Sequence, residues 1–184
     1  LQKRPEYMQA VIAFNQSKGK PVYPDANSTL RVTYGTVDGY PAADGVYKTP
    51  FTSVRGMIAK RQPAGEFVLP EKLVSAYQQQ RYQGYFHQSL GGQPALPFAS
   101  VPLNFLSSAD TTGGNSGSAV LNSRGELVGL NFDSTFESIS KDWYFNPAVT
   151  RAIHVDIRFV LWMMQHVDGA DNLLKEMTIV SEAG

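Results

Sequence analysis

The sequence predicts a mostly β fold with flanking helices. Its 184 residues are enough for about one domain. The 16 glycines and 11 prolines favour many turns and short strands over a helical bundle. Short apolar segments fill the middle of the chain, whereas apolar residues at helical spacing are found near both ends.

The first predicted element is a helix over residues 5–17. Pro5 suits its first turn, and its apolar residues recur at the i, i+3 and i+4 positions of a helix. These apolar residues are Met8, Val11 and Ile12. Residues 17–27 are rich in glycine, proline and aspartate, which predicts a linker or loop.

The next segment, residues 29–37, alternates apolar and polar residues, a pattern typical of a half-buried strand. Its apolar residues are Leu30, Val32 and Tyr34. Residues 38–45 predict a turn-rich segment, and residues 46–59 are long enough to contain one more strand. Residues 69–81 predict a short helix with Pro70 near its start.

The second half of the chain gives the clearest patterns. Residues 100–107 predict a strand that leads into a glycine-rich run. Two apolar segments, residues 118–122 and 125–133, are joined by a short glycine-containing turn, which indicates a hairpin. Residues 155–169 predict a helix that Asp156 caps and that ends at Gly169.

Charge and composition exclude several classes of function. The formal net charge is zero, so no basic surface indicates a nucleic acid or an anionic membrane as partner. No apolar run approaches the roughly 18 residues that span a bilayer. The chain has no cysteine, no phosphate-binding glycine motif and no metal-ligand spacing, so we expect neither a metal nor a cofactor.

The glycine-rich run "GGNSGS" at residues 113–118 is the strongest chemical motif. A serine hydroxyl becomes an effective nucleophile when a base takes its proton and fixed donors stabilise the oxyanion. Glycines around Ser116 allow a tight turn in which the backbone N–H groups of Gly114 and Ser116 are the two donors. The alternative is a polar hairpin loop without chemistry.

Strand-like sequence on both sides of this run favours a chymotrypsin-type double barrel over an α/β-hydrolase elbow. Beyond the motif, "GNSGSAVLNSRGELVGLNFDSTFES" and "NPAVTRAIHVDIRFVLWMMQHVDGADNLLKEM" resemble the C-terminal end of bacterial dipeptidyl aminopeptidases of the chymotrypsin clan. These are relatives of dipeptidyl peptidases seven and eleven. "STLRVTYGTVDGY" also resembles a strand of that family, so the similarity covers about residues 28–177.

The resemblance implies a fold and a set of roles. Residues 1–17 would be the last helix of a regulatory helical domain, and residues 18–184 the second β-barrel with its C-terminal helices. Ser116 would be the nucleophile and Gly114 part of the oxyanion hole. Asp133 would bind the free α-amino group of an oligopeptide, which sets the release of dipeptides. The family also implies the periplasm or the cell envelope.

Ser134 matches the position that sets the preference for the second substrate residue. Members that cut after acidic residues carry Arg there, and members that cut after apolar residues carry Gly. Ser134 is small and uncharged, so our hypothesis is a pocket for apolar or aromatic side chains.

The base is harder to find. The chain has three histidines, His87, His154 and His166, of which only His87 precedes Ser116, by 29 residues. In the resembling family the base and its orienting aspartate lie in the first barrel, far upstream. We therefore expect this chain to be a fragment that lacks both the base and its orienting aspartate, and that is inactive without the upstream half. The start without Met also favours a fragment.

Two alternatives remain at this point. One is an endopeptidase of the glutamyl endopeptidase or HtrA-like type, whose nucleophile loops are similar. The other is a non-catalytic barrel that binds peptides. Whether the protein forms a homodimer also stays open.

Overall fold

A computed structural model of the chain describes residues 3–20, 22, 28–81 and 100–180. The chain divides into two units, Leu1–Val32 and Thr33–Gly184, which are considered separately. The first unit contains helix α1 (Arg4–Ser17), which confirms the helix predicted over residues 5–17. No residue of α1 is buried.

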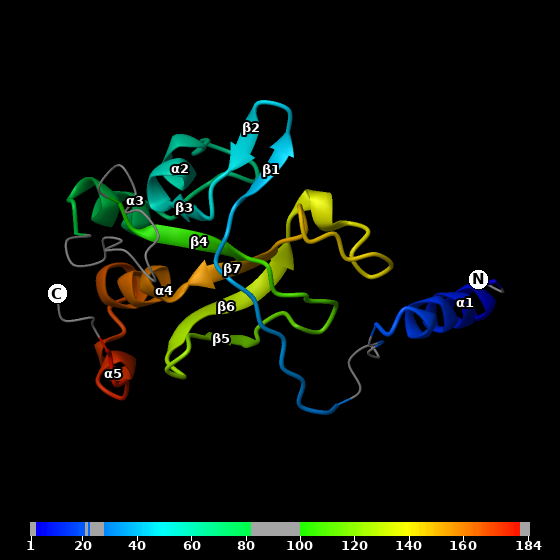
Figure 1. The fold of residues 1–184 in the computed structure, drawn as a ribbon. Helices are drawn as coiled ribbons and strands as arrows, with labels where there is room; N and C mark the ends of the chain where they lie inside the picture. The colour runs from blue at the N-terminus through cyan, green and yellow to red at the C-terminus, as the bar shows by residue number, and fades with distance from the viewer. Residues whose placement is uncertain (1–2, 21, 23–27, 82–99, 181–184) are drawn as a thin grey trace. The chain divides into compact units, whose positions relative to one another are not determined.

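The second unit is built on a five-stranded antiparallel sheet with the order β3-β4-β7-β6-β5 (Figure 1). Its strands are β3 (Phe51–Ser53), β4 (Pro102–Ser107), β5 (Ala119–Leu121), β6 (Leu127–Ser134) and β7 (Ala152–Asp156). Strand β4 confirms the prediction for residues 100–107. Strands β5 and β6 confirm the hairpin predicted after the glycine-rich run, and Gly125 takes a φ of 79° in its turn.

The predicted mostly β fold with flanking helices is therefore confirmed. The described residues form an open sheet, with β3 and β5 at its edges, and no closed barrel. The second-barrel assignment thus stays a prediction. A separate small hairpin joins β1 (Tyr40–Ala43) to β2 (Val46–Lys48).

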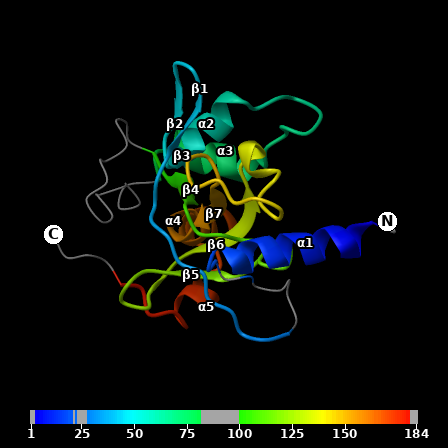
Figure 2. The same cartoon turned by 45° about the vertical axis from the view of Figure 1, so that its right-hand side comes forward.

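Helices cover one end of the sheet, where α4 (Ile157–Met163) packs against β4, β6 and β7 (Figures 1 and 2). The other helical elements are α2 (Val54–Ala59), α3 (Glu71–Gln78), the 3₁₀ turn Phe136–Ser138 and α5 (Asp171–Leu174). Trp162 of α4 is fully buried among apolar residues of α2 and α3, and its ring N–H donates to the Arg81 carbonyl at 2.8 Å. This apolar cluster fixes the helices to the end of the sheet.

The helix predicted over residues 155–169 begins at Ile157, because Val155 and Asp156 belong to β7, but its cap and its end lie where the sequence predicts them. The Asp156 side chain accepts a hydrogen bond from the Arg158 backbone N–H at 2.9 Å. A π-helical turn, Met164–Asp168, continues α4 to Gly169, which takes a φ of 66°. The helix predicted over residues 69–81 is likewise confirmed as α3. No helix among the described residues is long and apolar enough to cross a membrane.

The strand predicted over residues 29–37 is wrong. The described chain there forms no strand, apart from an isolated bridge between Val37 and Ser107. Leu30, Val32 and Tyr34 are 94%, 83% and 92% exposed. An alternating pattern becomes a strand when a neighbouring strand pairs with it and one face is covered, and neither condition is met among the described residues.

Two further predictions need correction. The turn-rich residues 38–45 contain β1, and residues 46–59 form two short strands and helix α2 instead of one strand. These strands have three or four residues each, too few to show a clear alternation.

Candidate active site

The loop that carries Ser116 is a compact turn between β4 and β5. The Thr112 backbone N–H donates to the Asn115 side-chain oxygen at 2.9 Å, and the Asn115 N–H donates back to the Thr112 carbonyl at 3.2 Å. Gly114 and Gly117 take positive φ angles of 98° and 84°, which disfavour residues with a side chain. The glycines at these two positions therefore allow the turn itself.

Strand β6 holds this loop in place. The Gly117 N–H donates to the Asn131 carbonyl at 2.7 Å, and the Asn131 N–H donates to the Ser118 carbonyl at 2.9 Å. The exposed Ser116 hydroxyl donates to the Phe132 carbonyl at 3.2 Å. The candidate nucleophile thus stands on the surface, beside the C-terminal end of β6.

The backbone N–H groups of Gly114 and Ser116 donate no hydrogen bond to any described part of the chain. Fixed and unoccupied donors of this kind, next to a serine hydroxyl, can stabilise an oxyanion. The local structure therefore leaves these two N–H groups unbonded within the described residues, and their role as oxyanion donors stays a prediction.

His154 is enclosed by the sheet. It lies on β7 with 2% of its surface exposed, its Nε2 is 2.7 Å from the Ser107 hydroxyl oxygen, and its ring packs on Phe105. Burial lowers the pKa of His154 to about 4. No described group bonds its Nδ1 atom. His154 therefore belongs to the interior and cannot reach a substrate.

The other histidines give no base either. His166 lies in the π-helical turn after α4, and burial, followed by the charge of Arg81, lowers its pKa. His87 lies outside the described residues. Among the described residues, no histidine hydrogen-bonds to the Ser116 hydroxyl.

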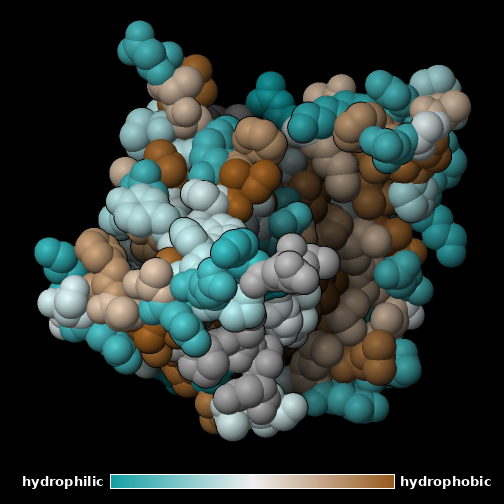
Figure 3. All heavy atoms as spheres, turned by 90° about the vertical axis from the view of Figure 1, so that its right-hand side faces the viewer, coloured by the Kyte–Doolittle hydropathy of each residue, from teal (hydrophilic) through white to brown (hydrophobic). Residues whose placement is uncertain are grey.

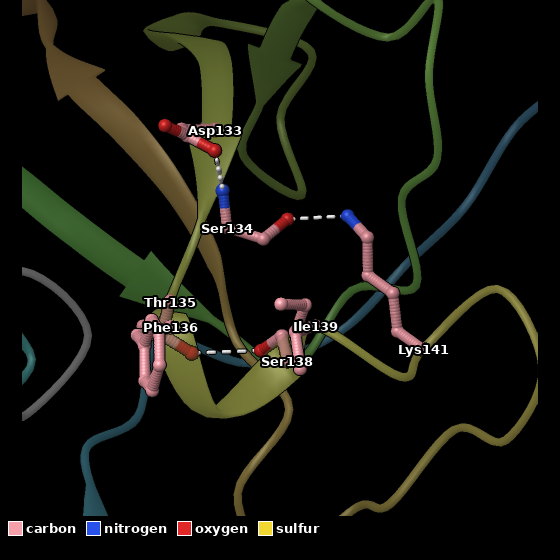
Figure 4. A pocket seen from close by; sticks show the side chains of 7 residues that line it. All are labelled: Asp133, Ser134, Thr135, Phe136, Ser138, Ile139 and Lys141. Atoms are coloured by element: carbon pink, nitrogen blue, oxygen red, sulfur yellow. Dashed lines mark hydrogen bonds between the residues drawn. The ribbon is translucent and has the colours of Figure 1, made fainter.

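A pocket of about 270 Å³ lies at the end of β6 and in the segment that follows it (Figure 4). Its lining residues are Asp133, Ser134, Thr135, Phe136, Ser138, Ile139 and Lys141. Figure 4 shows the side chains of Asp133 and Ser134 directed to different sides of the strand, as successive strand residues are. Asp133 is exposed, and its Oδ1 accepts the Ser134 N–H at 2.7 Å.

Lys141 is the charged lining residue that the sequence analysis did not single out. Its ammonium group donates to the Ser134 hydroxyl and, at 3.4 Å, to the Thr111 hydroxyl. Lys141 lies in a turn without a recognisable motif, so no local signal could have identified it. The fold alone brings it to Ser134.

The far wall of the pocket is tied to the small hairpin. The Glu137 carboxylate accepts from the Tyr40 hydroxyl at 2.6 Å and from the Lys48 ammonium at 2.8 Å. The hydrogen bonds from Lys48 and then Tyr40 lower the pKa of Glu137 to about 2. Phe136 and Ile139 of the same wall are 82% and 81% exposed. The face of the molecule shown in Figure 3 also exposes apolar side chains among hydrophilic ones.

The chain resembles known peptidases along nearly its whole length. A sequence model of the family described as peptidase S46 matches residues 1–179. The chain is 53% identical to the Asp/Glu-specific dipeptidyl-peptidase of Shewanella putrefaciens, over 96% of this chain and 26% of that protein. It is 43% identical to dipeptidyl-peptidase 7 of Phocaeicola vulgatus, over 88% of this chain and 21% of that protein.

A solved structure shows the same fold. The crystal structure of Porphyromonas endodontalis DPP11 in complex with the dipeptide Arg-Asp matches with a TM-score of 0.77 at 38% identity. The match covers 90% of this chain and 23% of that one. The chain thus spans about a quarter of the length of the relatives it matches. The resemblance predicted from the sequence is confirmed, and the chain belongs to the peptidase S46 family.

Proposed function

We propose that the chain is the nucleophile-bearing part of a longer serine-type dipeptidyl aminopeptidase. The observation that carries this proposal is the exposed Ser116 hydroxyl in a glycine-bounded turn, beside the unoccupied N–H groups of Gly114 and Ser116. Membership of the S46 family and relatives named dipeptidyl-peptidases support it.

In the proposed reaction, Ser116 Oγ attacks the carbonyl carbon that follows the second substrate residue, and a base takes the hydroxyl proton. The N–H groups of Gly114 and Ser116 bind the resulting oxyanion. The C–N bond breaks, and the leaving amine takes the proton back from the base. Water then hydrolyses the acyl ester, which releases the dipeptide and restores the serine.

We propose that the base and its orienting aspartate come from outside residues 1–184. No described histidine contacts Ser116, and the relatives are about four times as long as this chain. In this proposal residues 18–184 complete a chymotrypsin-like double barrel with an upstream half, and residues 1–17 end a regulatory helical domain. The periplasm or cell envelope is proposed from the family resemblance alone.

Asp133 is proposed to bind the free α-amino group. It directly follows Phe132, whose carbonyl accepts the Ser116 hydroxyl, so its backbone lies about 3.3 Å further along the strand. An ammonium held there sits at a fixed distance from the nucleophile. This arrangement would admit two residues and exclude an extended chain.

Two kinds of side chain are candidates for the second residue of the substrate. The sequence-based hypothesis of apolar side chains rests on Ser134 and remains to be tested. A specific observation favours acidic side chains instead, because the Lys141 ammonium contacts Ser134 inside the pocket. Relatives are named both Asp/Glu-specific dipeptidyl-peptidase and dipeptidyl-peptidase 7.

The test is chromophore release from a dipeptidyl amide by the full-length protein, with the amino group either free or blocked. We expect release from the free form alone. Release from both forms would indicate an endopeptidase, and release from neither would favour a peptide-binding barrel. Residues 1–184 alone should be inactive; activity of this chain would mean that it contains the base, and His87 would be the first histidine to replace.

Asp133→Asn should lower kcat/KM for free-amino substrates by about 30-fold or more. Removing one partner of a desolvated ion pair costs about 2–5 kcal/mol, and each 1.4 kcal/mol is a factor of ten. The exposed Asp171→Asn, at the start of α5, is the matched control and should retain the wild-type rate. An unchanged rate in Asp133→Asn would remove Asp133 from the proposed site.

A further inference from the structure

Lys141 is the only cation among the described residues that line the pocket. A lysine ammonium has three N–H donors, and hydroxyl groups of Ser134 and Thr111 accept two of them. The ammonium makes no ion pair with any described carboxylate. One N–H donor of the ammonium therefore remains for a ligand.

One hydroxyl group that the ammonium contacts belongs to β6, the strand whose Phe132 carbonyl accepts the Ser116 hydroxyl. Ser116 Oγ bonds to the Phe132 carbonyl, and Ser134 lies two residues further along β6. At about 3.3 Å per strand residue, Ser134 is roughly 7 Å from that carbonyl. In the proposed reaction, this span of the strand is within reach of the side chain next to the bond that Ser116 cuts.

On these grounds, and given the proposed function, we infer that Lys141 is a specificity-determining residue that binds the side-chain carboxylate of the second substrate residue. Position 134 itself carries no charge here. Ser134 leaves room in the pocket and holds the Lys141 ammonium by its hydroxyl. Asp133 and Lys141 then match the two charges of the substrate, an α-ammonium group and an acidic side chain.

The nearby carboxylate of Asp110 opposes the binding of a substrate carboxylate by Lys141. Asp110 is half-buried, and its burial raises its pKa, while the charge of Lys141 acts in the opposite direction. The two groups therefore lie within electrostatic range of each other. Replacing Asp110 by Asn should strengthen the attraction of Lys141 for a carboxylate. Removing the charge of Lys141 and removing the charge of Asp110 are thus expected to change the binding of a carboxylate in opposite directions.

The experiment compares kcat/KM of the full-length protein for two dipeptidyl amides that differ at the second residue, Asp or Leu. Wild type should prefer Asp. Lys141→Met should reduce the rate for Asp by about 10- to 100-fold, the value of one hydrogen bond to a charged group, and leave the rate for Leu within a few-fold. Lys141→Arg and Asp110→Asn should keep or increase the preference for Asp.

The matched control is Lys175→Met, on the exposed surface after α5, which should change neither rate. If Lys141→Met does not fold, as judged by its thermal unfolding, Lys141→Gln makes the same comparison.

A wild-type preference for Leu, or an equal loss for both substrates in the Lys141 variants, would overturn the inference and leave dipeptide release intact. Equal loss would mean that Lys141 only ties Ser134 to Thr111. If the wild type releases no dipeptide from any free-amino substrate, the proposed function fails, and the role of Lys141 fails with it.

Discussion

Two serines of this chain stand in opposite environments. Ser107, on β4, is buried, and its hydroxyl is 2.7 Å from His154 Nε2. Ser116 is exposed, and its hydroxyl contacts no described histidine. By distance alone, Ser107 and His154 would be the nucleophile and the base.

The surroundings reverse that conclusion. Ser107 and His154 are buried in the sheet, away from an approaching substrate carbonyl, and among the described residues no glycine-rich turn presents free N–H groups to them. Ser116 has the exposure and the two donors. Access and free N–H donors therefore favour Ser116 as the candidate nucleophile, although Ser107 has the serine–histidine hydrogen bond.

The largest expected effect tests this contrast directly. Ser116→Ala should reduce kcat of the full-length protein by at least about 10³-fold, as loss of a serine nucleophile does in other serine peptidases. Ser107→Ala should retain most activity and lower the free energy of unfolding by about 1–3 kcal/mol, because it leaves the His154 ring nitrogen without a partner. Steady-state kinetics and urea unfolding measure the two effects.

The opposite pattern would contradict our assignment. If Ser107→Ala is inactive while still folded, and Ser116→Ala is active, the buried pair would be the catalytic one.

The next effect concerns the pH dependence of stability. The pKa of His154 is about 4 in the folded state and 6.5 as the reference for the unfolded state. Between these values the unfolded chain binds a proton that the folded chain does not, so stability falls as the pH drops from about 6.5 to 4. The loss is on the order of 3 kcal/mol over that window and then levels off.

Urea unfolding of wild type and His154→Gln at pH 7 and pH 4 isolates this contribution, because the other titrating groups are common to both proteins. We expect a smaller loss of stability for the variant. Equal losses would mean that His154 titrates as an exposed histidine does.

The smallest expected effect tests whether the hydrogen bonds inside the Ser116 turn contribute to catalysis. Asn115→Ala removes the acceptor for the Thr112 N–H, a bond worth about 1 kcal/mol, and should lower kcat about 5- to 10-fold with little change in melting temperature. Asn115→Asp keeps an acceptor and is the matched control. A wild-type rate in Asn115→Ala would show that this bond does not position the oxyanion donors.

Local sequence predicted the region around the candidate site well. The hairpin β5–β6, the Asp156 cap of α4 and the end of its π-helical continuation at Gly169 all follow from residues close together in the chain. Glycine and capping residues act within a few positions of themselves, so their pattern is readable without the fold. The Ser116 turn belongs to this class, since its internal bonds join residues 112, 115 and 118.

Long-range pairing decided the rest. The alternation of Leu30, Val32 and Tyr34 predicted a strand, but strand formation depends on a neighbour that local sequence does not specify. The contact of Lys141 with Ser134 could not be predicted from the sequence either, because the sequence around a turn residue does not indicate which distant group its side chain contacts. The sequence by itself thus determined the family, the Ser116 turn and most elements of the sheet. The tertiary structure decided that His154 is buried with Ser107 and that a cation stands in the pocket, because both depend on which distant segments the sheet brings together.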